Sequence, residues 1–248
     1  MRRATAAVLT LVAGAGCGDG AGESTSAGDR GAGVGALGAG ARVETLARAS
    51  LRAPPPSPTV WVADEFRLRP GRAVTRAGSF AFVYARTGRL SLMLERARRT
   101  LEAGEAAAAP ARARRVYRTG EPGSAAWEIR LARRGSPVPE GARRIFESEP
   151  LEGIPERAAL SFLSVTVPPR GGRTTVHTHP GPELVYELSG TIDYQNALIG
   201  TRRLGPGGLE GIPPNTPVQK RNPYREPATF LSWFAVDPSR PFAPAASF

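Results

Sequence analysis

Short apolar segments, each broken within a few residues by Gly, Pro or Asn, recur along the chain from about residue 59 onward. Clear examples are residues 60–62, 80–84, 160–167, 184–186 and 230–236. Short β-rich runs with closely spaced turn signals are typical of a sandwich or barrel. Long helices are not expected, although residues 43–51 and 140–146 are predicted as short ones. The sequence therefore predicts an all-β fold.

The two halves of this strand-rich part resemble each other. Residues 82–88 align with residues 184–190, and both segments end in glycine. Further along, a Gly-x5-Pro spacing and then a tryptophan recur in the same order, at Gly104, Pro110 and Trp127 and again at Gly207, Pro213 and Trp233. Landmarks repeated in order indicate a duplication, and a duplicated barrel can cover the exposed face of its neighbour.

The N-terminus has the features of an export signal. Arg2 and Arg3 precede a short apolar stretch, residues 4–13, which is too short to cross a membrane. Small residues then lead to Cys17, the single cysteine, so an intramolecular disulfide is excluded. This pattern resembles a bacterial lipobox, which implies lipidation of Cys17, although Gly14 stands where leucine is usual. The alternative is an ordinary secretory signal, and both place the protein outside the cytoplasm.

We divide the chain into four segments. Residues 1–17 are the predicted signal peptide, and residues 18–55 are rich in Gly, Ala, Ser and Pro. The second segment has too little apolar surface to offset its ordering entropy, so we expect a flexible tether. Residues 56–138 form the predicted first barrel, and residues 139–248 form the second.

The formal net charge of +11 raises nucleic acid as a partner. However, the basic residues are arginines scattered among Ala, Gly and Pro, with Lys220 as the single lysine. Nucleic acid is therefore not expected. Lys220 and Arg221 could meet an anionic substrate at a barrel mouth, and Glu187 could act as an acid or base, but the solvated surface is the usual place for such charged side chains. After the N-terminus no apolar run is long enough to span a bilayer, which excludes a multi-span membrane protein.

One segment carries a metal-ligand pattern, Gly171-x5-His177-x-His179-x3-Glu183-x6-Gly190. The chain has no other histidines. Residues at even separations on a strand share a face, so these three side chains can converge inside a barrel. Two imidazoles and one carboxylate suit Fe(II) and can also accept Mn, Zn or Ni.

The same segment matches every defined position of the first cupin motif, G-x5-H-x-H-x3-E-x6-G, and so resembles the cupin family. The resemblance implies two cupin barrels in one chain, each a double-stranded β-helix of the jelly-roll type. It further implies one divalent metal ion on His177, His179 and Glu183, with Fe or Mn favoured over Zn or Ni. In the first half, residues 74–77 and Ala81 fall at the ligand positions, and none favours a metal.

The second cupin motif, G-x5-P-x-G-x2-H-x3-N, is matched less completely by residues 207–222. Asn215 replaces a glycine, because both residue types tolerate left-handed backbone. Val218 replaces a histidine that is a further metal ligand in the family. Three protein ligands leave more positions open for water or substrate, and they hold the metal less tightly.

Four further residues are placed near the predicted pocket. Val218 is expected to point inward and to form an apolar wall of the pocket, whereas Gln219 is expected to face the opposite side of the strand. Tyr186 and Trp233 are counted as candidate pocket residues, with packing aromatics as the more common role for such side chains. No catalytic residue is assigned.

We expect an exported metal-binding cupin protein that acts on or binds a small organic molecule, with a metal-dependent dioxygenase as one form of it. The alternative is a non-catalytic lipoprotein of the cell envelope that binds a small ligand, which the absent histidine and the degenerate first half favour. Whether the protein is an enzyme stays open. The expected partners are a small-molecule ligand, a membrane surface through the lipid anchor, and a second copy in a homodimer.

Overall fold

The computed structural model describes residues 38–55 and 57–248. The predicted signal peptide, Cys17 and the first part of the expected tether lie outside these residues. Every regular element among the described residues is a strand, which confirms the all-β prediction. In the described part of the chain, no helix has the length and hydropathy needed to cross a membrane.

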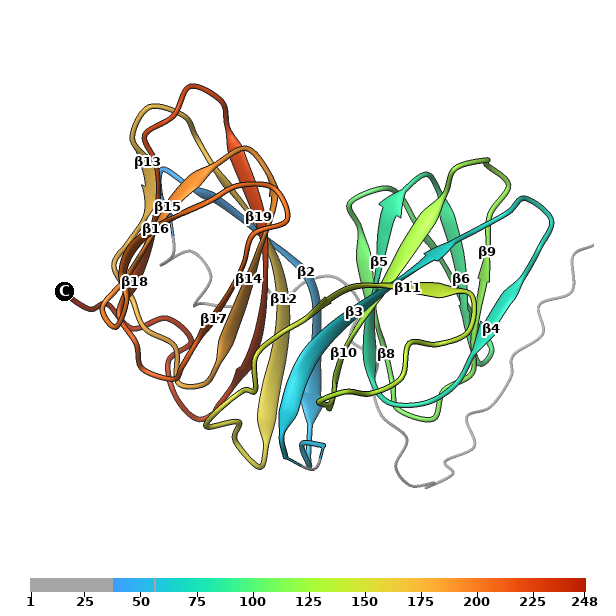
Figure 1. The fold of residues 1–248 in the computed structure, drawn as a ribbon. Coiled ribbons are helices and arrows are strands. Elements are labelled where there is room, and N and C mark those ends of the chain that lie inside the picture. Colours follow the sequence, from blue (N-terminus) through green and yellow to red (C-terminus); the bar gives the residue numbers. More distant parts are fainter. Residues whose placement is uncertain (1–37, 56) are drawn as a thin grey trace, which may run out of the picture. The chain divides into compact units, whose positions relative to one another are not determined.

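The first barrel consists of two antiparallel sheets (Figure 1). Its strands are β3 (Thr59–Arg67), β4 (Val74–Arg76), β5 (Ala81–Thr87), β6 (Leu90–Leu94), β7 (Ala97–Leu101), β8 (Ala106–Ala109), β9 (Arg115–Arg118), β10 (Ala125–Arg133) and β11 (Ala142–Glu147). One sheet has the order β11-β3-β10-β5-β8 and the other β4-β9-β6-β7. Phe66, Val83 and Tyr117 belong to the buried cluster between them.

The second barrel has the same construction from two five-stranded sheets. Its strands are β1 (Gly38–Ala39), β2 (Arg42–Leu51), β12 (Ala158–Val167), β13 (Gly172–Thr174), β14 (Glu183–Ser189), β15 (Ile192–Asn196), β16 (Gly200–Leu204), β17 (Leu209–Ile212), β18 (Val218–Asn222) and β19 (Ala228–Val236). The sheet orders are β1-β13-β18-β15-β16 and β17-β14-β19-β12-β2. Val165, Val185 and Phe230 belong to its core.

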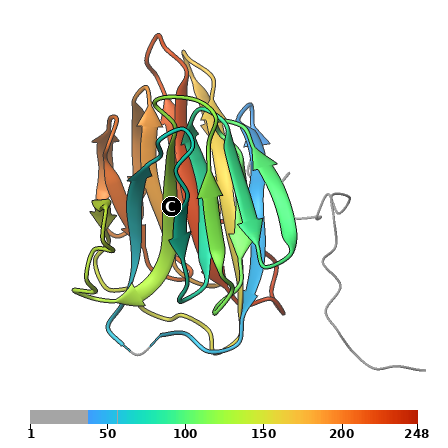
Figure 2. The same cartoon turned by 90° about the vertical axis from the view of Figure 1, so that its right-hand side faces the viewer.

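Both predicted short helices are wrong. Residues 43–51 lie in β2, which pairs with β12 from Leu51 opposite Ala158 to Arg42 opposite Thr166, and Figure 2 shows the two strands side by side. Residues 142–147 form β11, which pairs with β3. In each case the open edge of a long strand supplies backbone hydrogen-bond partners, which outweigh local helix propensity.

These two strands also change the expected boundaries. Residues 42–51 belong to a sheet of the second barrel, although the sequence predicts that residues 18–55 form a tether. Strand β11 belongs to the first barrel, beyond the predicted boundary at residue 138. The chain therefore contributes to the second barrel both before and after it builds the first.

An aromatic cluster joins the sheet containing β3, β5 and β10 to the sheet containing β12, β14 and β19. Phe162 of the second barrel lies with its ring centroid 5.7 Å from that of Phe82 and 5.1 Å from that of Trp233. Each barrel thereby covers an apolar face of the other, which is the arrangement that the internal repeat predicts.

Equivalent hydrogen bonds confirm most of the repeat. In the first barrel the amide of Gly104 donates to the carbonyl of Ala85, at 2.8 Å. In the second, the amide of Gly207 donates to the carbonyl of Glu187 at the same distance. The tryptophans, however, are not equivalent. Trp127 pairs with Tyr84 whereas Trp233 pairs with Leu184, so their positions in the repeat differ by two residues.

Candidate metal centre

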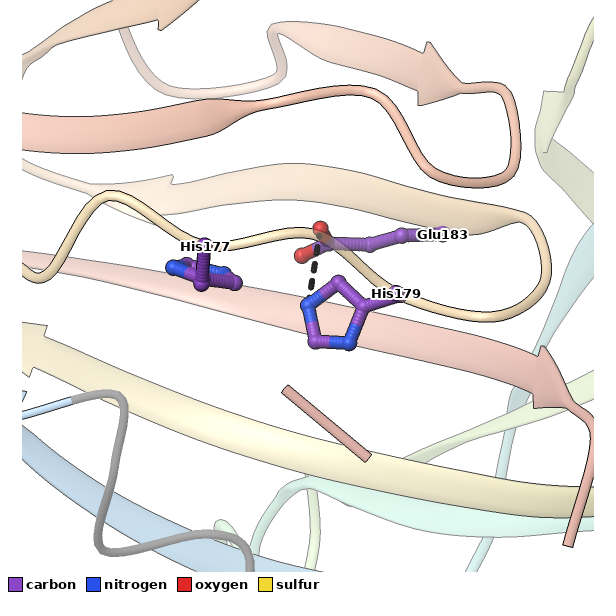
Figure 3. A group of neighbouring side chains, drawn as sticks. All are labelled: His177, His179 and Glu183. Atoms are coloured by element: carbon purple, nitrogen blue, oxygen red, sulfur yellow. Dashed lines mark ion pairs between the residues drawn. The ribbon is translucent and has the colours of Figure 1, made fainter. Parts of the chain in front are cut away.

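The three predicted metal ligands converge inside the second barrel (Figure 3). One candidate ligand atom from each of His177, His179 and Glu183 lies within 4.8 Å of the others. Their relative exposures are 1%, 3% and 1%. Glu183 begins β14, whereas both histidines lie in the loop before it. The expected convergence is therefore present, although a loop rather than a regular strand produces it.

Close backbone packing holds this loop in place. The amide of Ala235 on β19 donates to the carbonyl of Pro182 at 3.1 Å. A Cβ atom at Gly181 would lie 2.1 Å from the carbonyl oxygen of Ala235, so only glycine fits there. The prolines that the sequence places between His179 and Glu183 thus bend the chain against β19 and bring the three side chains together.

Both imidazoles are oriented by hydrogen bonds to backbone carbonyls. Nδ1 of His177 donates to the carbonyl of Thr175 at 2.8 Å, and Nδ1 of His179 donates to that of Phe242 at 2.7 Å. Because a carbonyl only accepts, Nδ1 carries the hydrogen and Nε2 keeps its lone pair. Nε2 of His179 is buried 3.6 Å from Oε2 of Glu183, and no group among the described residues forms a hydrogen bond with it.

Burial keeps both imidazoles neutral. Burial, reinforced by Lys220 and the neighbouring imidazole, lowers the pKa of His177 to about 3. Burial also lowers the pKa of His179 to about 4, against the opposing effect of Glu183. A neutral imidazole with Nδ1 bonded to a carbonyl is the form that ligates metal ions through Nε2.

Lys220 also belongs to this cluster. The prediction that it lies on the solvated surface is wrong. Its side chain is 1% exposed, and its ammonium donates to both carboxylate oxygens of Glu183, at 2.9 Å each. The hydroxyl of Ser232 also donates to Oε1 of Glu183 at 2.9 Å. Burial raises the pKa of Glu183, but Lys220 and the two histidines outweigh it and hold that pKa below its ordinary value.

Strand alternation explains this placement. Along β18, Val218, Lys220 and Asn222 are buried, whereas Gln219 and Arg221 are not. The prediction for adjacent charges, which treats Lys220 and Arg221 alike, is wrong because successive strand residues face opposite sides. Lys220 lies two positions after the inward-facing Val218 on the same strand, so strand alternation alone predicts that Lys220 also faces inward.

The predicted orientations of three residues around the second cupin motif are confirmed. Val218 points inward, since it is fully buried and exchanges backbone hydrogen bonds with His177, but it does not line the cavity beside the ligands as predicted, and it offers no ligand atom. Gln219 faces the other side, where its amide donates to the carbonyl of Thr174 at 2.9 Å. Asn215 has a φ of 59°, the left-handed conformation for which it replaces glycine.

Tyr186 and Trp233 do not line the pocket. Tyr186 packs against Trp127 with ring centroids 5.5 Å apart. Tyr186 and Trp233 both belong to the aromatic cluster between the barrels. Phe230 lines the cavity instead, and the rings of Phe234 and Phe242 have centroids 4.6 and 4.9 Å from that of His179. The sequence shows that one residue of the pair 233–234 faces inward, but it does not show which.

The space left among these side chains is small. A cavity of about 10 Å³ is lined by Val165, Thr174, His177, Glu183, Lys220, Phe230, Ser232 and Phe234. This volume is close to the minimum for one water molecule. The C-terminal segment pairs with the histidine loop, through hydrogen bonds from Thr178 to the carbonyl of Pro244 and from Ala246 to that of Val176, at 3.1 Å each.

The first barrel has a different interior, as its sequence predicts. Ala81, like Glu183, begins the strand that carries the repeat, and it supplies no ligand. Instead, Arg115 and Glu128 form a buried ion pair at 3.3 Å, and the Tyr117 hydroxyl donates to the same carboxylate. Within residues 38–55 and 57–248, the cluster in the second barrel is the one group of three or more suitable side chains placed to hold a metal ion.

Comparison with known proteins agrees with this architecture. Residues 163–234 match the family model described as a cupin domain. The matched residues lie in the second barrel and include Glu183 but neither of the first barrel's sheets. No curated protein matches the chain by sequence.

Solved structures share the two-barrel fold of this chain. AerE from Microcystis aeruginosa superposes with a TM-score of 0.52 at 14% identity, covering 73% of this chain and 89% of that one. A mutant of Bacillus subtilis oxalate decarboxylase OxdC gives 0.52 at 15% identity, covering 75% and 71%. Lactobacillus farciminis oxalate decarboxylase in a formate complex gives 0.54 at 14% identity, covering 74% and 79%. At these identities the similarity establishes the fold alone, which is two cupin barrels in one chain.

Proposed function

We propose that the second cupin barrel binds one divalent metal ion through His177, His179 and Glu183. The observation that carries this proposal is the state of His179, whose Nδ1 is fixed on the carbonyl of Phe242 while its Nε2 is buried without a partner. An unpartnered buried nitrogen is costly unless a ligand completes it. The neutral imidazoles and the carboxylate form a suitable donor set.

The donor set narrows the choice of ion. Two imidazole nitrogens and one carboxylate, with no thiolate, favour Fe(II) or Mn(II), and Zn(II) or Ni(II) can also be accepted. When bound, such an ion supplies Lewis-acid or redox chemistry at its open coordination positions. The residues of this chain orient the imidazoles, exclude water and set the charge around Glu183.

Binding without catalysis is the form of this function that the cavity favours. A volume of about 10 Å³ has no room for an organic substrate beside the proposed ion. A small organic ligand would reach the metal only after the segment containing Phe242 moves. We therefore propose a metal-binding cupin protein of the cell envelope, exported by the signal at residues 1–17.

A metal-dependent oxygenase is the second candidate. It is favoured by Val218, which replaces a fourth protein ligand and leaves additional positions open on the ion. The two candidates differ in one measurable property. Oxygen consumption by the metal-loaded protein with a panel of small organic acids would support the oxygenase, and its absence would support binding alone.

Elemental analysis tests the metal site itself. The purified chain is dialysed against Fe(II), Mn(II), Zn(II) or Ni(II), and bound metal is measured per chain. The expected stoichiometry is ~1, as for a single closed site, and His177→Ala should abolish it. Gln219→Ala is the matched control, because Gln219 is close in the fold but faces away from the cluster. A folded wild type that binds none of the four ions, even at millimolar concentration, would rule out the proposal.

A further inference from the structure

We infer that Lys220 is an internal cation that competes with the metal ion for Glu183, so that the ammonium weakens metal binding. This inference rests on the proposed metal site and names a residue that sets the affinity of that site for metal. Its basis is a contact that the cupin motifs do not contain. The ammonium lies 2.9 Å from both carboxylate oxygens of Glu183.

The two cations need the same oxygens. Lys220 donates to both oxygens of Glu183, and Ser232 donates to one of them as well. These three hydrogen bonds occupy most of the acceptor positions of the carboxylate, so a metal ion that takes Glu183 as a ligand competes with them for the same two oxygens. A divalent ion so close to the ammonium would also experience strong repulsion, since the interior screens charges poorly.

The choice of residue supports a specific role. The chain uses arginine almost throughout, and its single lysine stands at this buried position. Lysine carries a compact charge on a flexible stem, so it can withdraw from a carboxylate more readily than a forked guanidinium can. The Lys220 ammonium also lies 5.8 Å from the centroid of the Phe230 ring, within the range of a cation–π contact.

The first barrel provides a contrast at equivalent positions. Tyr117 pairs with Leu92 on the neighbouring strand as Lys220 pairs with Tyr194, so the two occupy the same place in the repeat. There the buried cation is Arg115, which is held by Glu128 and by the carbonyl of Ser79 at 2.7 Å. That pair has no imidazoles beside it and acts as a fixed structural contact. In the second barrel the cation faces two neutral histidines, one with an unpartnered Nε2.

The test compares metal affinity in Lys220→Met and wild type, using Mn(II) and Zn(II) in separate titrations. Removal of the ammonium frees both oxygens, so we expect Kd to fall by about 100-fold, the equivalent of one to two charged hydrogen bonds. Arg221→Met is the matched control, because it removes the same charge from the adjacent, exposed position. It should leave Kd unchanged. Adding His179→Gln to Lys220→Met should abolish the gain.

Two outcomes separate this inference from the proposed function. If wild type and Lys220→Met bind metal equally tightly, the competition is refuted while the metal site stands. If neither binds Mn(II) or Zn(II), the metal site itself is refuted, and the competition with it. An equal gain in Arg221→Met would also refute the inference, because a general charge effect would then explain it.

Thermal unfolding covers the case in which Lys220→Met is unstable. Without the ammonium, Glu183 is left buried and unpaired, so the metal-free variant should unfold below wild type. Saturating Zn(II) should raise its midpoint by more than it raises that of wild type, because tighter binding to the folded state gives a larger shift. Lys220→Gln is the fallback, since its amide still donates to Glu183 but carries no charge. An equal Zn(II) shift in all three proteins would contradict the competition.

Discussion

Nδ1 of His179 lies 2.7 Å from the carbonyl oxygen of Phe242, so the C-terminal segment orients one of the proposed metal ligands. The same segment pairs with the histidine loop through Thr178 and Ala246. The Phe242 ring packs on His179 and on Phe234. A residue more than sixty positions from His179 therefore both orients this ligand and packs over it.

Removal of residues 241–248 should weaken metal binding. His179 would lose its hydrogen-bond acceptor, and partners of this kind are typically worth about 10–100-fold in metal affinity. Metal should also leave faster, because the cover over the cluster is gone. The Kd for Zn(II) and the rate of Zn(II) transfer to a chelator measure the two effects.

Two variants separate the hydrogen bond from the cover. Phe242→Ala keeps the backbone carbonyl and removes the ring, so it should speed release with little change in the orientation of His179. Removal of residues 247–248 alone retains the hydrogen bonds of Pro244 and Ala246, and it should behave as wild type. If the longer truncation leaves both Kd and release rate unchanged, the C-terminal segment has no role at the site.

The sequence is sufficient to predict the fold and the convergence of the three candidate ligands. His177, His179 and Glu183 match a spaced motif, and the flanking turn residues fix the barrel around it. The conformation of Asn215 could also be predicted, because few residue types adopt a positive φ. Such features depend on local geometry, which the sequence encodes directly.

The surroundings of the ligands could not be predicted in the same way. Phe242 reaches His179 from a distant part of the chain, and no local pattern indicates that contact. The buried position of Lys220 is not predicted for another reason. Charged residues usually lie on the surface, and this expectation outweighs the strand alternation that places Lys220 on the same inward face as Val218. Strand β2 was missed because its partner, β12, lies more than one hundred residues away. Long-range pairing decides each of these cases.

Glu187 is a second buried carboxyl whose surface assignment is wrong. It is fully buried on β14, and neither carboxyl oxygen has a hydrogen-bond partner. Ala85 occupies the equivalent hydrogen-bonded position of the first barrel, and its side chain has no polar atom that needs a partner. Burial raises the pKa of Glu187 to about 8, so the folded protein keeps the group protonated at neutral pH.

This shift predicts a loss of stability as pH rises. Below the ordinary pKa of a glutamate, near 4.5, the group is protonated in both states and has no linked effect. Between that pH and about 8 the unfolded chain ionises while the folded chain does not, so stability declines, and it levels off above pH 8. Replacement of Glu187 by an uncharged side chain should remove this contribution.

Glu187→Met should therefore stabilise the protein at pH 9, by on the order of 3 kcal/mol, and much less at pH 5. Urea unfolding at the two pH values measures the difference. Glu226→Gln is the control, because that side chain is exposed and its loss should leave the pH dependence intact. Parallel pH profiles for wild type and Glu187→Met would contradict the assignment.

The buried pair of the first barrel predicts a stability effect without any effect on metal. Glu128→Ala leaves Arg115 buried without its counter-ion, which should cost about 3–5 kcal/mol. Glu102→Ala breaks an exposed pair with Arg89, and it should cost less than about 1 kcal/mol. Chemical denaturation measures both values. A small loss in Glu128→Ala would mean that water enters the first barrel and replaces the carboxylate.

Two glycines of the first cupin motif should respond differently to alanine. Gly171 has a φ of 111° and open space around it, so Gly171→Ala should cost about 1 kcal/mol from backbone strain alone. Gly190 has a φ of 79°, and a Cβ there would lie 2.4 Å from the carbonyl oxygen of Pro227. Because backbone atoms cannot yield as a flexible side chain can, Gly190→Ala should cost at least about 3 kcal/mol. Urea unfolding measures both variants. If they unfold at the same urea concentration, the backbone near Pro227 moves away from the new Cβ at little cost. Glycine would then be needed at both positions only for its positive φ.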